Sequence, residues 1–254
     1  MLLSLEKVQK TFGGLTAVDG ASFVVGAGEV HGLIGPNGAG KTTLLNLVSG
    51  LIRPTSGAIV LDGERIDGLP SHEVAARGLT RTFQNIRLFP ALTAADNVLV
   101  GAHLKRRAPL WRRMAFLPSA AAEARAAHEA SVALLERVGM GERAHERASN
   151  LSYGEQRRVE IARALASEPR VMLLDEPTAG MNPAEVASIA ELIRGVARAG
   201  HSVLLVEHNV KLVMDVCDRI TVLDFGKVIA DGTPAEVARD PAVIAAYLGG
   251  EAAA

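Results

Sequence analysis

The sequence predicts an α/β protein: a mixed or parallel sheet with flanking helices, an N-terminal antiparallel β-subdomain and an inserted α-helical subdomain. Three observations lead to this fold class. The first 30 residues alternate apolar and polar positions between glycines, which is typical of short antiparallel strands. Residues 93–166 are rich in alanine, leucine, arginine and glutamate at helical spacing. From Val171 onward, continuous apolar runs alternate with a helical pattern, as in a buried parallel sheet.

The chain of 254 residues is long enough for one large domain with a lobe. We expect a single domain over 1–254, with a core made of 1–92 and 167–254 and a helical subdomain over 93–166. Apolar runs predict strands at Val30–Ile34, Ala58–Leu61, Val171–Leu174 and Ser202–Val206, and a strand pair within Ile220–Ala230. Helices are expected at 42–51, 157–166 and 183–199, and two short ones near 234–239 and 242–248.

The segment Gly35-Pro-Asn-Gly-Ala-Gly-Lys-Thr-Thr43 contains G-x-x-x-x-G-K-T between an apolar strand and a helical pattern. Glycines let the backbone turn its N–H groups toward one centre, and the helix start adds partial positive charge. Lys41 can reach the β- and γ-phosphates, and Thr42 can offer its hydroxyl to Mg²⁺. An ordinary glycine-rich turn is the alternative, but it does not require all four fixed positions. The sequence therefore predicts a P-loop NTPase core.

Two adjacent carboxylates come directly after Val171–Leu174, at the edge where open α/β sheets bind ligands. Asp175 can bind Mg²⁺ through a water, and Glu176 can then address the water that attacks the γ-phosphate. The metal compensates the charge of one acid, so neighbouring acids can have different tasks. The alternative is a strand that ends in a capping acid pair; beside a phosphate-binding loop, the metal-and-base interpretation is favoured.

A second helix start lies at Leu151-Ser-Tyr-Gly-Glu-Gln156. A serine and a glycine there can form another anion-binding end. One chain does not need two anion-binding helix starts for one γ-phosphate. In a symmetric pair of chains, this helix start of each chain could close over the nucleotide held by the loop of the other chain, which implies an isologous dimer. An ordinary N-cap at Ser152 explains this segment equally well.

In this order and spacing, Gly35–Thr43, Leu151–Gln156 and Leu174–Pro177 resemble the ATP-binding cassette (ABC) ATPases over essentially the whole chain. The resemblance implies the ABC ATPase fold, hydrolysis of ATP with Mg²⁺, and a signature segment at Leu151–Glu155. Tyr153 and Glu155 depart from the common L-S-G-G-Q. Ser152 and Gly154, which would meet the γ-phosphate held by a second chain, are retained.

The resemblance also implies roles for single residues. Gln84 looks like the loop glutamine that senses Mg²⁺ and links the core to the helical lobe. His208 looks like the switch histidine that contacts the γ-phosphate, the alternative being a surface histidine at a helix start. Phe12 lies where these proteins stack an aromatic ring on adenine, the alternative being a core phenylalanine. Asn182 ends a loop that ends in aspartate in many relatives.

The expected site residues fall into three groups. The catalytic residues are Lys41, Glu176 and His208. The nucleotide-binding residues are Phe12, Gly35, Pro36, Asn37, Gly38, Ala39, Gly40, Lys41, Thr42, Thr43, Ser152, Gly154 and Glu155. The metal-binding residues are Thr42, Gln84 and Asp175. The remaining histidines (His31, His72, His103, His128, His145 and His201) are expected to be structural, and Cys217 to be a small apolar filler in a helix.

Further segments look like the ATPase subunits of branched-chain amino acid importers. They are Phe12–Val18, Arg81–Phe89, Ser149–Arg158, Ala179–Pro183, Glu207–Met214 and Ile244–Gly249, and the long stretch Gly101–Ser131 resembles the larger of that system's two ATPase types. Urea-type importers and a lipopolysaccharide-export ATPase look similar at several of the same segments. A soluble, non-transport ABC ATPase is a further alternative, although such proteins usually have tandem cassettes or a long coiled-coil insertion.

As an importer subunit, the chain would work with membrane-embedded permease subunits, a second identical or related ATPase subunit and, indirectly, a solute-binding protein. We expect the chain to be a peripheral protein at the cytoplasmic face of the inner membrane. The sequence contains no uninterrupted run of about 18 apolar residues, so no transmembrane helix is expected. The balance of 27 Lys and Arg against 28 Asp and Glu gives no argument for nucleic acid. Basic residues within 105–113 are expected to form a solvated loop, with membrane-surface contact as the alternative.

Overall fold

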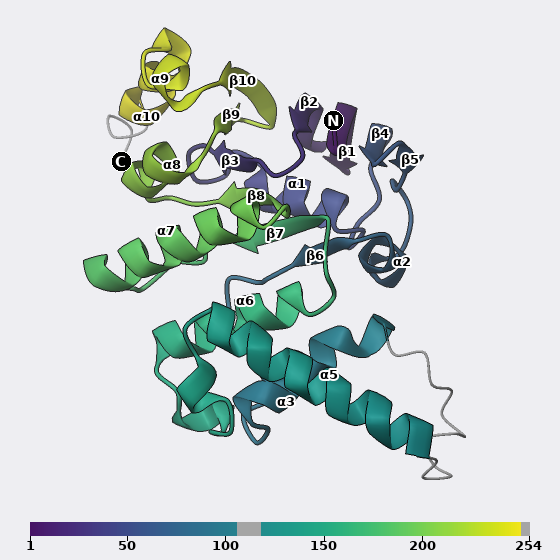
Figure 1. Cartoon of the computed structure of the whole chain (residues 1–254). Coiled ribbons are helices and arrows are strands. Elements are labelled where there is room, and N and C mark those ends of the chain that lie inside the picture. Colours follow the sequence, from purple (N-terminus) through teal and green to yellow (C-terminus); the bar gives the residue numbers. More distant parts are fainter. Residues whose placement is uncertain (106–117, 250–254) are drawn as a thin grey trace. The chain divides into compact units, whose positions relative to one another are not determined.

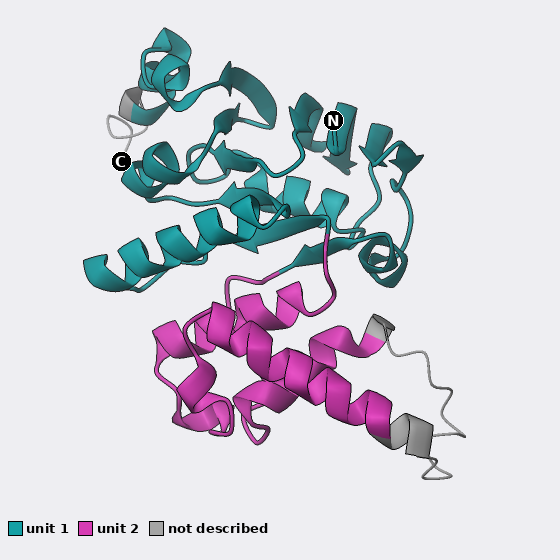
Figure 2. Cartoon of the chain, in the orientation of Figure 1, with its two compact units in different colours: residues 1–81, 170–254 teal, residues 82–169 magenta. Residues whose placement is uncertain are grey.

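The structure, a computed structural model, describes residues 1–105 and 118–249 (Figure 1). It divides into two compact units: unit 1 contains Met1–Arg81 and Arg170–Ala254, and unit 2 contains Thr82–Pro169 (Figure 2). The predicted helical subdomain, 93–166, falls within unit 2. Arg106–Arg113, which make up most of the predicted basic segment, lie outside the described residues.

The first sheet of unit 1 is antiparallel and has four strands in the order β2-β1-β4-β5. Its strands are β1 (Leu3–Phe12), β2 (Leu15–Val25), β4 (Ser56–Leu61) and β5 (Glu64–Arg65). The alternating burial along β1 and β2 matches the alternating hydrophobicity of the sequence. The predicted N-terminal antiparallel subdomain is therefore confirmed.

The second sheet of unit 1 is mixed and has six strands in the order β10-β9-β3-β8-β7-β6. Its strands are β3 (Val30–Ile34), β6 (Leu79–Arg81), β7 (Val171–Asp175), β8 (Ser202–Val206), β9 (Arg219–Asp224) and β10 (Lys227–Gly232). All pairs are parallel except β9 with β10, which form the predicted hairpin. The strands β3, β7 and β8 are buried along their whole length, as their continuous apolar runs predict.

The described helices of unit 1 are α1 (Lys41–Val48), α2 (Ser71–Ala76), α7 (Pro183–Arg198), α8 (Val210–Val216), α9 (Pro234–Val237) and α10 (Pro241–Gly249). Of these, α1, α7, α9 and α10 lie close to their predicted positions, whereas α2 and α8 were not predicted. Helix α1 ends before the predicted Leu51, because Gly50 has a φ of +69° and a right-handed helix cannot include a residue with this conformation. Cys217 is buried but comes directly after α8 rather than lying in a helix, and burial raises the pKa of its thiol to about 12. No helix among the described residues is both long and apolar enough to cross a bilayer.

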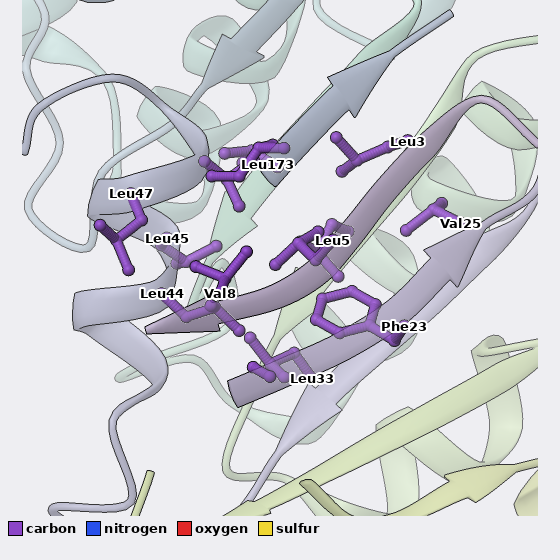
Figure 3. Packing of buried hydrophobic residues seen from close by; sticks show 14 of the residues in the cluster. Leu3, Leu5, Val8, Phe23, Val25, Leu33, Leu44, Leu45, Leu47 and Leu173 are labelled. Atoms are coloured by element: carbon purple, nitrogen blue, oxygen red, sulfur yellow. The ribbon is translucent and has the colours of Figure 1, made fainter. Parts of the chain in front are cut away.

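One hydrophobic cluster joins both sheets of unit 1 to α1 (Figure 3). Leu5 and Phe23 come from the antiparallel sheet, Leu33 and Leu173 from the mixed sheet, and Leu45 from α1. Burial of such side chains contributes roughly 1.5–3 kcal/mol each. The cluster therefore fixes the end of β3 and the start of α1, and with them the loop that connects the two.

Unit 2 is helical in its described part. It contains α3 (Ala94–Gly101), η1 (Ala102–Lys105), α5 (Pro118–Arg137), η2 (Gly141–Arg143), η3 (Ala148–Asn150) and α6 (Tyr153–Leu165). Helix α3 packs against both α5 and α6. The fully buried Asn97 fixes the chain that leads into α3, because its amide exchanges hydrogen bonds of 2.8 and 3.1 Å with the backbone of Phe89.

Candidate functional site

Three neighbouring parallel strands end at one edge of the mixed sheet of unit 1. The order β3-β8-β7 places the ends of these strands side by side. Because the strands themselves are buried, polar chemistry becomes available only where each one ends. The loop Gly35–Gly40, the acids Asp175 and Glu176, and the pair Glu207–His208 therefore meet at this edge, where open α/β sheets bind ligands.

The loop after β3 has the backbone that a phosphate-binding loop needs. Gly35 and Gly40 have φ values of +151° and +102°, and a Cβ atom there would lie 2.0 Å from Leu223 O and 2.4 Å from Ala17 O, respectively. Only glycine fits at both positions. Gly40 also begins α1 without any side-chain cap, so the N–H groups of the first turn have no partner from a capping residue. Uncapped amides at a helix start favour an anion.

The side chain of Lys41, the residue after this loop, folds back onto the loop. Its Nζ donates hydrogen bonds to Gly35 O (2.7 Å) and Pro36 O (2.9 Å), and the residue is only 7% exposed. Burial lowers the pKa of the ammonium, whereas the carboxylates of Glu176 and Asp175 raise it. The cation is thus held at the loop and is electrostatically linked to both predicted acids.

A cavity of about 380 Å³ lies over this edge of unit 1. Its volume is within the range of small-molecule sites. Predicted site residues on its wall are Asn37, Gly38, Ala39, Gly40, Lys41, Thr42, Thr43, Glu176 and His208, and the other lining residues are Leu15, Thr16, Ala17 and Phe225. The structure therefore brings most of the predicted nucleotide-binding loop together with Glu176 and His208.

Glu176 and His208 contact each other directly. Glu176 Oε1 lies 2.7 Å from His208 Nε2, although the two residues come after different strands. Glu176 has a φ of +47°, which is unfavourable for a residue with a side chain, and its N–H donates to Val206 O (2.9 Å). Strain of this kind is stored at functional sites, and here it is fixed by a hydrogen bond to the strand that carries His208.

The buried Glu207 connects the two loops that carry these residues. Its Oε1 accepts hydrogen bonds from the Thr178 amide (2.9 Å) and hydroxyl (2.6 Å), and its Oε2 accepts one from the His208 amide (3.1 Å). One carboxylate therefore holds the chain just after Glu176 and the backbone of His208 in a fixed relation. Such charge-assisted bonds are stronger than neutral ones.

Asp175 is almost buried and is paired with Arg81 at the end of β6. Its Oδ2 lies 2.9 Å from Arg81 Nη2, and the two side chains are 10% and 6% exposed. Arg81 Nη1 also donates to Asn46 (2.6 Å) and Ser49 (3.2 Å), at α1 and its C-terminal cap. The pair fixes the carboxylate and compensates its charge, which a buried acid requires.

Phe12 is half-exposed at the end of β1, with Lys10 Nζ 4.9 Å from the centre of its ring. It is therefore not a core phenylalanine. It is also not among the described residues that line the cavity, where Leu15 of the neighbouring strand is found instead. The contact between Phe12 and adenine stays a prediction.

The predicted signature segment lies at the start of α6 in unit 2. Ser152 is the N-cap and accepts from the Glu155 amide (3.4 Å), while Glu155 Oε2 accepts from the Ser152 amide (2.8 Å). Ser152 therefore caps α6, and Glu155 completes a capping box, while the contact of Ser152 with the γ-phosphate of a second chain stays a prediction. The Ser152 amide hydrogen bond holds the pKa of Glu155 below its usual value, so the residue is anionic at neutral pH. Asn182, in unit 1, caps α7 in the same way with Glu185.

A buried arginine links this helix to the predicted glutamine loop within unit 2. Arg157 is fully buried and donates to the carbonyls of Phe83 (2.8 Å) and Gln84 (2.6 Å), to the Tyr153 hydroxyl (3.1 Å) and to Glu160 (2.5 Å). Tyr153, which departs from the usual signature, thus has a partner through its hydroxyl. The backbone of Gln84 is fixed by these bonds, and the metal contact of its side chain stays a prediction.

Several residues of the site were not predicted from the sequence, among them Arg81, Arg157, Glu207 and Phe225. Glu207 comes after an apolar strand and precedes the predicted switch histidine, a position that favours a functional acid. For Arg157 the only signal is a charged residue inside a predicted helix, and the strand that ends in Arg81, β6, was not predicted. The turn around Phe225 gave no signal of a ligand contact.

The P-loop nucleoside triphosphatases bind phosphates with loop amides and a lysine, and they orient the attacking water with a side chain such as a carboxylate. Comparisons with known proteins narrow this class. The family model described as ABC transporter matches residues 18–179, and a second model, described as branched-chain amino acid ATP-binding cassette transporter, matches residues 227–253. The chain therefore belongs to the ABC transporter family, as one of its ATP-binding, ATP-hydrolysing subunits.

Individual relatives are similar in sequence over nearly the whole chain. The chain is 44% identical to the branched-chain amino acid transport ATP-binding protein BraF of Pseudomonas aeruginosa and 42% identical to LivG of Escherichia coli, with 98% of each chain covered. It is 38% identical to the lipopolysaccharide export ATP-binding protein LptB of Haemophilus influenzae, over 98% of this chain and 97% of LptB.

Solved structures show the same fold. The ADP conformation of MJ1267, an ATP-binding cassette of an ABC transporter, matches with a TM-score of 0.85 at 29% identity, covering 98% of each chain. The dimeric cassette MJ0796 matches with a TM-score of 0.77 at 27% identity, covering 92% of this chain and 99% of that one. The predicted ABC ATPase fold is confirmed.

Proposed function

We propose that this chain hydrolyses ATP to drive an importer of branched-chain amino acids. The observation that carries the hydrolytic part is the 2.7 Å contact between Glu176 and His208 on the wall of the cavity that also contains Lys41. A carboxylate and an imidazole at this separation can accept and hold a proton beside a phosphate group. The loop amides and Lys41 then stabilise the negative charge on the phosphates.

In the proposed reaction, Glu176 orients a water molecule and accepts its proton, and the oxygen of that water attacks the γ-phosphorus. His208 donates a hydrogen bond to the γ-phosphate and keeps it in line. Glu207 acts as a positioning residue, because it holds the backbone on both sides of this pair. ADP leaves with the bridging oxygen, and Lys41 with the α1 amides offsets the charge on it.

The residues present fit Mg²⁺. The Thr42 hydroxyl belongs to the cavity wall, and the Asp175 carboxylate is close enough to Lys41 to raise its pKa. Hydroxyl and carboxylate oxygens, completed by phosphate oxygens and waters, are the ligands that Mg²⁺ prefers. We assign Thr42, Asp175 and Gln84 to this ion, which would neutralise charge between the β- and γ-phosphates.

We further propose that two such chains close over ATP. Ser152, Gly154 and Glu155 would then meet the γ-phosphate of the nucleotide bound by the other chain. The dimeric state of the similar cassette MJ0796 supports this assembly. Unit 2, with Gln84 at its beginning, would pass the closure to membrane-embedded permease subunits.

The proposed solute rests on the relatives. BraF and LivG are branched-chain amino acid transport proteins, and the family model over residues 227–253 carries the same description. A solute-binding protein and a peripheral position on the cytoplasmic face of the inner membrane belong to this proposal. Lipopolysaccharide export is the second candidate, because LptB is also similar, at a lower identity of 38%.

Replacing Glu176 with glutamine tests the hydrolytic proposal. Glutamine keeps the size of the side chain but cannot accept the proton, so we expect ATP turnover to fall by at least about 100-fold while ATP still binds. Glu191→Gln, an exposed acid on α7, is the control and should keep its turnover. Unchanged hydrolysis in Glu176→Gln would remove this residue from its role.

Deleting the gene in its own cell tests the solute. Uptake of radiolabelled leucine, isoleucine and valine should fall, and the wild-type gene should restore it, whereas the Glu176→Gln gene should not. Normal uptake of all three, together with loss of lipopolysaccharide from the outer membrane, would replace the importer by the second candidate.

A further inference from the structure

The C-terminal helix α10 has no role in the hydrolysis proposed above, although its sequence is part of the resemblance to branched-chain amino acid importers. The family model over residues 227–253 contains the whole helix. Asp240 caps its start, because Asp240 Oδ1 accepts from the amides of Ala242 (2.8 Å) and Val243 (3.4 Å). Val243 is 7% exposed, and α10 packs against β10. The helix is therefore attached to the hairpin of β9 and β10.

This hairpin lies beside the strand that leads into the phosphate-binding loop. The order β10-β9-β3 places β9 next to β3, with Ile34 level with Val222. Gly35, the first residue of the loop, follows Ile34, and the Leu223 carbonyl occupies the space that a side chain at Gly35 would need. Helix α10 is thus attached only two strands away from the beginning of the loop.

Tyr247 of α10 reaches the loop directly. Its hydroxyl accepts a hydrogen bond from the Gly35 amide. Tyr247 is partly buried, whereas Ile244 and Ala245 of the same helix are exposed. Burial raises the pKa of the hydroxyl, and the bond from Gly35 opposes this shift, so the group keeps its proton at neutral pH.

Gly35 connects this tyrosine to the catalytic lysine. The Gly35 carbonyl accepts a hydrogen bond of 2.7 Å from Lys41 Nζ, while the Gly35 amide donates to Tyr247. Glycine has more backbone freedom than any other residue, so its conformation must be fixed by its contacts. Tyr247, Gly35 and Lys41 therefore form one chain of hydrogen bonds from α10 to the ammonium group.

We propose that Tyr247 is a positioning residue for Lys41. Its hydroxyl holds the Gly35 backbone, and the Gly35 carbonyl in turn holds the ammonium where the phosphates bind. The proposal rests on the proposed function, because it requires a triphosphate at Lys41. It gives α10 a role in the reaction and accounts for a hydroxyl on a helix of otherwise apolar residues. Packing of the Tyr247 ring is the rival explanation.

The test is calorimetry on the full chain with Tyr247→Phe, which keeps the ring and removes only the hydroxyl. ATP should bind about 2- to 10-fold more weakly, the range expected for one lost hydrogen bond. Inorganic tripolyphosphate should weaken by the same factor, because Lys41 contacts the phosphates that both compounds share. The melting temperature without ligand should fall by a few degrees at most.

Two further variants separate the hydroxyl from the ring and from the helix. Tyr247→Leu, which removes both the hydroxyl and the ring, should weaken both compounds at least as much as Tyr247→Phe and should melt at a lower temperature. Ile244→Ala, at an exposed residue of the same helix, should bind both compounds as the wild type does. For a merely structural tyrosine, Tyr247→Phe would match the wild type and only Tyr247→Leu would differ.

Three results would overturn the proposal. If Tyr247→Phe binds both compounds as tightly as the wild type, the hydroxyl does not position Lys41, and the ring only packs. If ATP weakens and tripolyphosphate does not, Tyr247 acts on the nucleoside and not through Lys41. If Ile244→Ala weakens both compounds as much as Tyr247→Phe, the effect belongs to the helix as a whole. Failure of the wild-type chain to bind either compound would instead contradict the proposed function itself.

Discussion

Two helices of this molecule begin in opposite ways. Helix α1 of unit 1 begins at Gly40 with no side-chain cap, whereas α6 of unit 2 begins at Ser152 with a complete capping box. At α1 the uncapped amides are open to an anion. At α6 two of the amides already have partners within the chain. The comparison teaches that α1 offers the amides of its first turn to a phosphate held by the same chain, whereas at α6 the capping box already binds two amides, so the proposed contact with a second chain's γ-phosphate would use the other groups at this helix start.

The same contrast extends to the charges around each helix. Beside α1, Lys41, Glu176 and His208 lie on a cavity wall, and Glu176 has an unfavourable backbone conformation. Within α6, Arg157 and Glu160 are at most 1% exposed and bind each other at 2.5 Å. Substitutions at the first group should change turnover more than stability, and substitutions at the second should change stability first.

The largest effect is expected for Arg157→Met. The change leaves Glu160 buried with less compensation and removes the donor for the Phe83 and Gln84 carbonyls, so the free energy of unfolding should fall by about 3–5 kcal/mol. Urea denaturation measures this loss. The double variant Arg157→Met, Glu160→Leu should recover part of it. A double variant no more stable than the single one would show that the pair is not the cause.

The pH dependence of this variant has a definite sign. Burial raises the pKa of Glu160, although Arg157, Arg163 and the Arg87 amide oppose the shift. A raised pKa in the folded state favours folding at low pH, and the benefit disappears as pH rises through it. Because Arg157→Met removes one of the opposing cations, its loss of stability should be larger at pH 8 than at pH 5.

The next largest effect is expected for Lys41→Ala. Loss of one charge-stabilising group at the phosphates typically costs about 3 kcal/mol or more, so turnover should fall by at least about 100-fold. The melting temperature should change little, in contrast to Arg157→Met. Lys211→Ala, at an exposed lysine of α8, is the matched control. Near-normal turnover in Lys41→Ala would contradict the loop assignment.

A smaller effect on turnover is expected for Glu207→Gln. The neutral amide keeps one acceptor oxygen, so the hydrogen bonds lose their charge assistance and either Thr178 or the His208 amide loses its acceptor, at a cost of about 1–3 kcal/mol. We expect kcat to fall with little change in KM, because Glu207 positions groups and does not line the cavity. An equal rise in KM would indicate a role in nucleotide binding instead.

The smallest effect is expected for Glu155→Ala. Loss of half of the capping box should lower the stability by about 0.3–1.5 kcal/mol at pH 7. The hydrogen bond from the Ser152 amide lowers the pKa of Glu155 from its usual 4.5. The stabilisation by the ionised carboxylate is therefore fully present above pH 4.5 and is lost as the pH falls through the lowered pKa. The difference between the two melting temperatures should therefore shrink in acid. A constant difference down to about pH 3 would assign the effect to helix propensity.

Local patterns predicted the edge of the sheet well. The apolar runs of β3, β7 and β8 are continuous; the run of β7 leads into Glu176, a glycine-rich motif after β3 contains Lys41, and the resemblance to the ABC ATPases implied His208. The partners of these residues could not be predicted. Glu207 binds Thr178 and Arg81 binds Asp175 because of strand order, which no local pattern contains. Phe225 was missed because turn propensities do not predict phenylalanine at positive φ.

The way in which unit 2 is inserted has a consequence for engineering. The chain leaves unit 1 after β6 and returns just before β7, and these strands are hydrogen-bonded neighbours, with the Arg170 amide 2.7 Å from Gly78 O. Neighbouring strands lie about 5 Å apart. Because β6 and β7 are parallel and Arg81 is level with Leu173, the exit after Arg81 and the return at Arg170 are also offset by three residues along the strands, so a lobe that replaces residues 82–169 must join points roughly 11 Å apart. Chimeras that keep Gln84 and Ser152–Glu155 in the new lobe would test the proposed contact between unit 2 and the permease subunits while unit 1 stays the same.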